Sequence, residues 1–173
     1  KTEAILKRDS IIIRAYNDIY EDVKKLTGKV LLDDQIVNYQ IFNNLNCEIK
    51  TAPNPTQHFK AIKNETEIKA TKNAHIKDGV AMTKFMYWLK NNVGKIELDE
   101  VTISDKLAAF RKEQNEFFDL SFDTICGYNA NAALMHYKAE PGNCAKVTNE
   151  GMLLIDSGGQ YLDGTIDTTR TFV

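Results

Sequence analysis

The most constraining feature of the chain lies near its end, where two aspartates interrupt apolar, β-prone sequence. The run Leu153–Ile155 ends in Asp156 and is predicted to form a strand buried on both faces, and Asp167 stands in the β-prone run that follows. A carboxylate is costly to bury unless it is paired or bound to a cation. A turn at Asp163-Gly164 brings the two runs side by side, so that both carboxylates can point at one spot. Such a pair suits divalent metal ions, and one carboxylate can bridge two ions about 3.5–4 Å apart.

The same spacing also fits a purely structural role. Aspartate is a common turn residue, so Asp156 can cap a turn at Ser157-Gly158 while Asp167 lies exposed on a strand. The Gly158-Gly159 pair is too short for a phosphate-binding loop and opens no helix, and we interpret it as a tight turn between the two strands. Spacing alone therefore leaves the metal site and the structural role both open.

Composition excludes several classes of protein. The chain has 173 residues, of which 43% are hydrophobic and 27% charged, as in ordinary soluble globular proteins. A net charge of −2 predicts neither nucleic acid nor an anionic membrane surface as a partner, and the apolar runs are too short to span a bilayer. The three cysteines form no CxxC pair, which favours free thiols in a reducing, cytoplasmic compartment.

The segment Pro53-Asn54-Pro55 is the clearest break in the chain. Proline restricts its own backbone and that of the preceding residue, which predicts an extended connector over residues 54–62. Residues 1–53 are then the end of a preceding domain, and residues 63–173 begin a second one. The chain starts without an initiator methionine and stops inside the β-prone run Thr171–Val173, from which we expect an internal fragment of a longer protein.

Periodicity predicts alternating helices and strands in the first part of the chain. A helix capped by Asp9 or Ser10, with apolar positions up to Val23, is expected to end at Gly28, and Lys29–Leu32 is expected to be a strand. A second helix over Ile36–Leu45 and a strand over 46–51 follow. This alternation is typical of part of an α/β layer domain.

The second part is predicted to be α+β. Asn64 and Glu67 resemble a capping box that opens a long helix ending at 91–94. Another helix is expected to open at Thr102 and Asp105 and to end near Asn115. The strands expected after it are residues 121–125, 134–137, 152–157 and 166–172, separated by glycine- and proline-containing turns.

Three segments carry a resemblance to a known family. The string LLIDSGGQYLDGTIDTTRTF (153–172) closely resembles the signature of the Xaa-Pro aminopeptidases, of the creatinase/methionine aminopeptidase superfamily (peptidase family M24). CGYNANAALMHYKAE (126–140) resembles the segment with the family's substrate-contacting histidine, and residues 59–89 resemble the first helix of its catalytic domain. The resemblance implies the first half of a pita-bread fold, preceded by the end of a creatinase N-terminal-type α/β domain.

The resemblance also implies roles for individual residues. Asp156 and Asp167 match two metal ligands, of which the second bridges both ions, and His136 matches the catalytic histidine that contacts the substrate. The implied cofactor is a pair of divalent ions, manganese by precedent, that activate a bridging water. The implied substrate is a peptide with proline in second position, and the implied parent protein is a homodimer. The family completes its site with a histidine and two glutamates that this chain lacks, so we expect the chain alone to be inactive.

Several alternatives remain at this stage. A prolidase or a methionine aminopeptidase shares the two-aspartate spacing, and a non-catalytic pita-bread protein used for binding is a third possibility. Without the resemblance, His136 is better interpreted as a structural histidine, because it has no partner at metal-ligand spacing. Cys126 and Cys144 flank it in sequence, but a Cys–His nucleophile lacks the expected strand–turn–helix context and is rejected.

Overall fold

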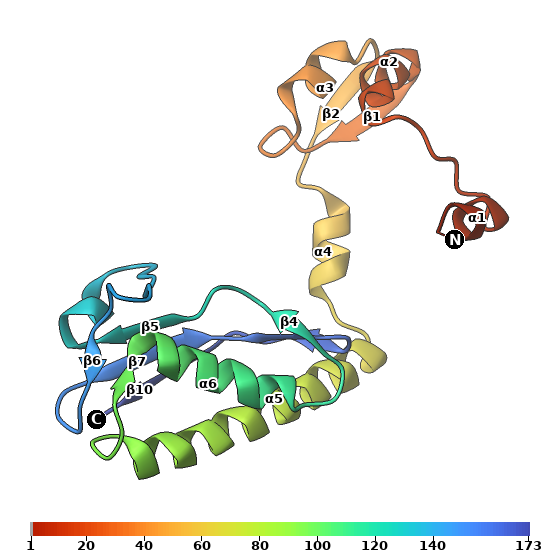
Figure 1. Ribbon diagram of the computed structural model, residues 1–173. Coiled ribbons are helices and arrows are strands. Elements are labelled where there is room, and N and C mark those ends of the chain that lie inside the picture. The colour runs from red at the N-terminus through yellow and green to blue at the C-terminus, as the bar shows by residue number, and fades with distance from the viewer. Residues whose placement is uncertain (1) are drawn as a thin grey trace. The chain divides into compact units, whose positions relative to one another are not determined.

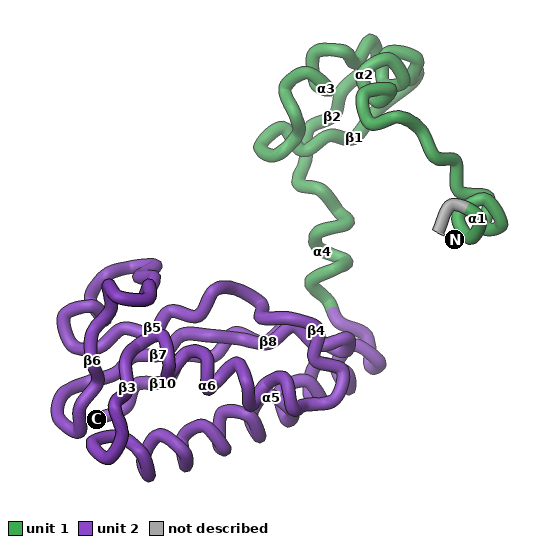
Figure 2. The backbone as a smooth tube through the Cα atoms, viewed as in Figure 1, with its two compact units in different colours: residues 1–62 green, residues 63–173 purple. Residues whose placement is uncertain are grey.

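The computed structural model of the protein describes residues 2–173. The chain divides into two compact units, residues 1–62 and 63–173, which are coloured separately in Figure 2. Within the described residues, none of the helices combines the length and the apolar character needed to cross a membrane.

The first unit is a small α/β element. Strands β1 (Lys29–Leu32) and β2 (Glu48–Thr51) pair in parallel, and α3 (Tyr39–Asn44) lies between them in sequence. Parallel neighbours require such a crossover connection. The remaining elements of the unit are α1 (Thr2–Arg8), η1 (Tyr16–Asp18), α2 (Ile19–Asp22), η2 (Val23–Lys25) and α4 (Pro55–Ala61).

The helix expected from Asp9 or Ser10 to Gly28 is confirmed only in its second part, where η1, α2 and η2 follow one another over residues 16–25. Helix α1 ends before these residues, Ser10 adopts a left-handed conformation with φ 59°, and residues 11–15 are not helical. Three consecutive isoleucines occupy this stretch, and β-branched side chains lose rotamer freedom in a helix. The apolar spacing at these positions therefore did not produce one continuous helix.

The extended connector expected over residues 54–62 is also wrong, because α4 occupies most of it. Pro55 stands at the first helical position, where its missing N–H costs nothing and its fixed φ suits the helix. The side chain of Asn54 caps this helix by accepting a hydrogen bond from the Thr56 amide at 3.0 Å. Proline here starts a helix rather than extending the chain.

The long helix α5 (Glu65–Asn92) begins as predicted. Asn64 accepts from the Glu67 amide at 2.9 Å, and the Glu67 carboxylate accepts from the Asn64 amide at 2.8 Å, which completes the capping box. The helix ends within the predicted 91–94 segment, where Gly94 adopts φ 73°. Both ends follow from residues close in sequence.

Helix α6 (Glu100–Lys112) starts earlier than expected. Asp99 caps it by accepting from the Thr102 amide at 2.7 Å, so Thr102 is the third residue of the helix and not its opening. The cap lies in the short strand β3 (Leu98–Asp99), which pairs with β6 (Lys146–Val147).

The remaining strands form two three-stranded sheets. The first has the order β10-β7-β5 and the second β4-β8-β9, all antiparallel. Their members are β4 (Phe117–Leu120), β5 (Ile125–Tyr128), β7 (Leu153–Ser157), β8 (Gly159–Tyr161), β9 (Gly164–Thr165) and β10 (Thr168–Phe172).

Two of the expected strands are wrong. Residues 121–124 connect β4 to β5, because Ser121 leaves the sheet and bonds across to the Gly158 and Ile166 carbonyls. Residues 134–137 follow the 3-10 helix η3 (Asn129–Ala133) as an irregular turn. Alternation of apolar residues over four positions does not distinguish a strand from such a turn.

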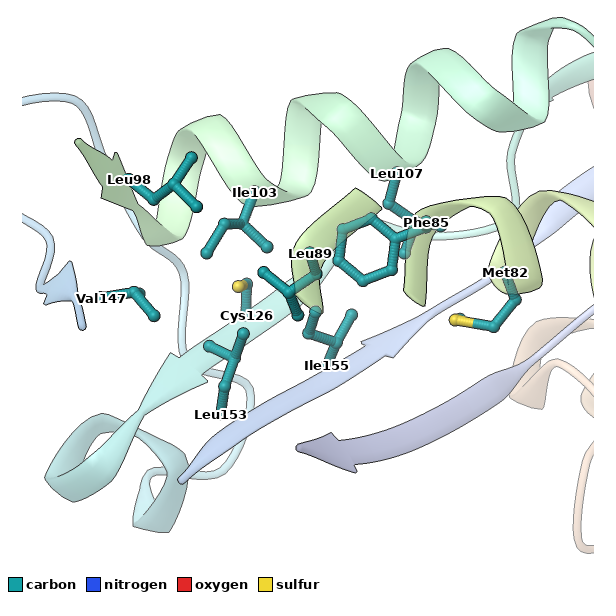
Figure 3. Packing of buried hydrophobic residues seen from close by; sticks show 10 residues of the cluster. All are labelled: Met82, Phe85, Leu89, Leu98, Ile103, Leu107, Cys126, Val147, Leu153 and Ile155. Carbon is teal, nitrogen blue, oxygen red and sulfur yellow. The ribbon is translucent and has the colours of Figure 1, made fainter. Parts of the chain in front are cut away.

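The core of the second unit lies between its helices and the β10-β7-β5 sheet. Helices α5 and α6 pack against one face of these strands (Figure 1). Figure 3 shows the side chains that meet there, with Phe85 from α5, Leu107 from α6 and Ile155 from β7 all fully buried. Burial of each such side chain stabilises the fold by roughly 1.5–3 kcal/mol.

Candidate metal centre

Asp156 lies on the face of the sheet that the helices leave uncovered. Along β7 every second residue, beginning with Leu153, is buried toward the helices, whereas Leu154 and Asp156 are only partly buried on the other face. The expectation of a strand buried on both faces is therefore wrong within this chain. The Asp156 Oδ1 atom accepts a hydrogen bond from the Thr169 hydroxyl at 2.8 Å, across the β7–β10 pair.

Asp167 is exposed and lies one residue before β10. The pairs Asp156–Thr169 and Gln160–Thr165 belong to one register, so residues 153–172 form one long hairpin in which Asp167 stands opposite Gly158. The turn expected near Asp163-Gly164 is present between β8 and β9. The two aspartate-bearing segments are thus neighbours, as the sequence predicts.

The two carboxylates share one face of this hairpin. Ile166 is buried with Ala74 of α5, so the next residue, Asp167, faces away from the helices, as Asp156 does. Asp167 lies outside the strands, between the paired stretches β7–β10 and β8–β9, so the pairs on either side of it set its place in the hairpin.

Gly158 allows the hairpin to close at this point. A Cβ atom at Gly158 would lie 1.7 Å from the Ile166 carbonyl oxygen and 2.3 Å from the Ser121 hydroxyl. The expected tight turn at Gly158-Gly159 is wrong, because the chain continues there from β7 into β8. The glycine instead permits close approach of the strand that carries Asp167.

No cation compensates these two charges among the described residues. Within residues 2–173 the Asp167 carboxylate forms neither a hydrogen bond nor an ion pair, and the Asp156 carboxylate accepts a hydrogen bond only from the Thr169 hydroxyl. Like charges on adjacent strands repel, whereas two carboxylates that face one point provide hard oxygen donors for a divalent ion. The donor set therefore fits metal binding. Within the part of the chain that is described, however, no group of three or more His, Cys, Asp or Glu side chains gathers to complete a site.

His136 lies outside the strands, in the turn that follows η3. Its side chain is exposed and its backbone has φ 55°, in the left-handed region. Within residues 2–173 no hydrogen bond joins His136 to Asp156 or Asp167. The structure thus brings the two aspartates together on one hairpin and holds the histidine on a separate loop.

Burial excludes Cys126 as a nucleophile. Its side chain is fully buried in the core, and desolvation raises the pKa of the thiol to about 12. Only the thiolate is strongly nucleophilic, so this cysteine is protonated and inert near neutral pH. The sequence-based rejection of a Cys126–His136 pair agrees with this environment.

Two buried carboxylates, Asp78 and Glu100, were not predicted from the sequence, and each binds several hydrogen-bond donors. Asp78 receives two hydrogen bonds from Arg111, at 2.7 and 3.0 Å, and one from the Tyr161 hydroxyl at 3.0 Å. Burial and the nearby Asp78 raise the pKa of Tyr161 above its usual value. Glu100 is the second such group, and it bonds to the loop that bears His136. A single acidic residue on a helix gives no sequence signal of burial, since most are solvated.

Both parts of the chain match known domain families. Residues 69–173 match metallopeptidase family M24, and residues 1–67 match the creatinase/prolidase N-terminal domain. A probable Xaa-Pro aminopeptidase P from Sclerotinia sclerotiorum is 39% identical over 96% of this chain and 30% of its own length. The corresponding protein from Coccidioides posadasii is 40% identical over 94% of this chain and 29% of its own.

Solved structures show the same fold. The X-prolyl aminopeptidase of Caenorhabditis elegans, described as a cytosolic enzyme with a di-nuclear active site, superposes with a TM-score of 0.86 and 31% identity, covering 98% of this chain and 30% of that one. The prolidase of Pyrococcus furiosus superposes with a TM-score of 0.70 at 20% identity, over 94% of this chain and 49% of that one. At this level of identity the likeness establishes only a shared fold.

The chain thus spans about 30% of the length of the curated relatives that it matches. The matches confirm the predicted fold class, an α+β peptidase domain of pita-bread type that follows part of a creatinase N-terminal-type domain. The match to metallopeptidase family M24 covers more than half of the chain, and this protein therefore belongs to that family.

Proposed function

We propose that this chain is part of an aminopeptidase that removes the N-terminal residue from peptides with proline in second position. The observation that carries the proposal is the pair of uncompensated carboxylates, Asp156 and Asp167, on one face of a single hairpin. Relatives that match nearly the whole chain at 39–40% identity are named as Xaa-Pro aminopeptidases. The proposed domains are 1–53, a connector over 54–62, and 63–173.

Asp156 and Asp167 are the residues proposed to hold two divalent ions, with manganese as the proposed metal. Such ions supply a water of lowered pKa and polarise a carbonyl oxygen. Within the chain, the Thr169 hydroxyl orients the Asp156 carboxylate by donating a 2.8 Å hydrogen bond to its Oδ1 atom. The other oxygen, Oδ2, is left free to bind a metal ion.

His136 is proposed to contact the substrate. Its exposed imidazole can hydrogen-bond to the carbonyl oxygen of the bond to be cleaved, where negative charge develops during attack. The left-handed backbone fixes the direction in which the ring projects from the loop.

We further propose a cytoplasmic enzyme, which the cytosolic C. elegans neighbour supports, and a homodimeric parent protein.

A substrate panel tests the function directly. The full-length protein that contains this chain is assayed with a tripeptide that has proline second, with an Xaa-Pro dipeptide, and with a Met-Ala tripeptide, each with Mn²⁺ and after chelation. We expect metal-dependent cleavage of the proline tripeptide. Preference for the dipeptide indicates a prolidase, preference for Met-Ala a methionine aminopeptidase, and absence of any cleavage a binding protein. Each of these three outcomes overturns the proposal.

The isolated 173-residue chain is expected to bind Mn²⁺ weakly and to lack peptidase activity. Two carboxylates are only part of a ligand set, and no third candidate ligand joins them among the described residues. Metal affinity follows the number and geometry of the ligands. Isothermal titration calorimetry on this chain measures the affinity directly. Tight binding of Mn²⁺ by the chain alone contradicts this expectation.

A further inference from the structure

We propose that Glu100 and Tyr137 are positioning residues that fix the loop bearing His136 and thereby control how His136 meets the substrate. The inference rests on the proposed function, because it assigns a consequence for catalysis to a buried contact. Its physical basis, a loop tied at several points to one carboxylate, is independent of the reaction.

Glu100 is the shared anchor of this loop. Its side chain is 0% exposed although it belongs to the first turn of α6. Its carboxylate oxygens accept hydrogen bonds from the Tyr128 amide at 2.7 Å, the Tyr137 hydroxyl at 2.8 Å and the Ala145 amide at 2.8 Å. The Asn131 side-chain amide adds contacts at 3.0 and 3.2 Å to the two oxygens. Each partner is a donor, which matches an acceptor-only carboxylate.

Capping of the helix does not explain the burial of Glu100. Asp99 already accepts from the Thr102 amide at the start of α6. The acidic residues in the first turn of α5, Glu65 and Glu67, are exposed, as is usual for this position. Burying a carboxylate costs free energy that only its partners offset. All four partners of Glu100 lie between residues 128 and 145, so its bonds serve that segment.

The anchored contacts bracket His136. Tyr137 follows it directly, and the Tyr137 hydroxyl also accepts a hydrogen bond from Asn131 at 3.0 Å. The start of the segment is tight as well, because a Cβ atom at Gly127 would lie 2.8 Å from the Ala132 Cα. The loop is therefore clamped on both sides of the histidine, while the imidazole itself stays exposed.

The backbone of His136 needs such a clamp. A non-glycine residue with φ 55° is strained, and such conformations persist where the surrounding structure over-determines them. The Tyr137 amide donates a hydrogen bond to the Leu134 carbonyl at 3.3 Å, and the Tyr137 hydroxyl donates one to the Glu100 carboxylate. Burial, reinforced by the bond to Glu100, raises the pKa of Tyr137 to about 12, so the hydroxyl keeps its proton near neutral pH.

Tyr137→Phe is the variant that tests the proposal, because it removes one hydroxyl and leaves Glu100 with its other donors. Tyr128→Phe is the matched control. The Tyr128 hydroxyl bonds to Thr148 and to the Glu150 carbonyl, away from Glu100. In the full-length protein we expect Tyr137→Phe to lower kcat/KM for the proline tripeptide about tenfold. The reason is that the variant loses one hydrogen bond to a charged group, which loosens the position of His136. Tyr128→Phe is expected to change it less than about twofold.

A double-variant cycle separates positioning from a general structural effect. If Tyr137 acts through His136, Tyr137→Phe has no further effect in a His136→Ala background. Full additivity of the two losses, or wild-type kcat/KM in Tyr137→Phe, overturns the inference. An unaffected His136→Ala variant overturns both the inference and the proposed role of His136.

Hydrogen exchange of the same proteins tests the anchor without reference to activity. Peptides that cover residues 131–138 are expected to exchange faster in Tyr137→Phe than in wild type or Tyr128→Phe. Unchanged exchange in this segment overturns the inference whatever the kinetics. If the wild type cleaves no peptide while the segment loosens as expected, the proposed function fails and the anchor stands.

Discussion

Replacement of Asp167 by asparagine in the full-length protein is expected to lower kcat/KM for a proline tripeptide by about 10³-fold or more. The substituted amide keeps the size of the side chain but lacks the charge that would balance the proposed metal ions. A factor of about 10³ corresponds to about 4 kcal/mol of transition-state stabilisation. Metal content measured by atomic emission should fall together with activity, while circular dichroism stays unchanged because Asp167 is exposed and forms no ion pair within residues 2–173.

Asp105→Asn is the matched control for this experiment. Asp105 is an exposed aspartate on α6, and its replacement should leave both metal content and kcat/KM at the wild-type level. Turnover at the normal rate by Asp167→Asn, with the metal retained, would remove the basis of the metal-centre assignment.

The second large effect is expected for Asp78→Ala, which should destabilise the protein by about 3–5 kcal/mol. The variant leaves the Arg111 guanidinium buried at 0% exposure without its anion, and the Nη1 atom of Arg111 already has no partner among the described residues. The Tyr161 hydroxyl loses its acceptor at the same time. The midpoint of urea unfolding, followed by fluorescence of the full-length protein, measures the loss.

Two further variants show whether this loss comes from an uncompensated charge. Glu113→Ala removes an exposed ion pair with Lys84 and should cost at most about 1 kcal/mol. Asp78→Ala combined with Arg111→Met removes both charges, and we expect it to recover much of the lost stability. A double variant as unstable as Asp78→Ala would show that packing, and not the unpaired guanidinium, sets the cost.

Features whose cause lies within a few residues were predictable from the sequence. The capping box of Asn64 and Glu67 involves atoms of one helical turn, and the strand Lys29–Leu32 follows from a short β-prone run after Gly28. The position of the Asp163-Gly164 turn, and with it the pairing of the two aspartate segments, also follows from local residues. The fold class was accessible because motifs over most of the chain resemble one family.

Periodicity failed where the outcome depended on features that apolar spacing does not encode. Residues 11–15 have helical spacing, but three consecutive β-branched isoleucines occupy them and Ser10 before them adopts a left-handed conformation. Pro55 begins a helix because Asn54 precedes it as a cap, whereas the Pro-Asn-Pro pattern is equally compatible with extended chain. The turn at His136 is held by contacts to α6, which no pattern in residues 134–137 reveals.

The sequence by itself determined the capping box that opens α5 and the hairpin that pairs the two aspartate segments, because each depends on neighbouring residues. Only the tertiary structure decided that both aspartates occupy the uncovered face of the sheet and that Asp78 and Glu100 are buried anchors. Burial and hydrogen bonding of a carboxylate depend on groups that arrive from distant segments, such as Arg111 for Asp78 and Tyr137 for Glu100. The cost of desolvating a charge is offset only when those groups are in place.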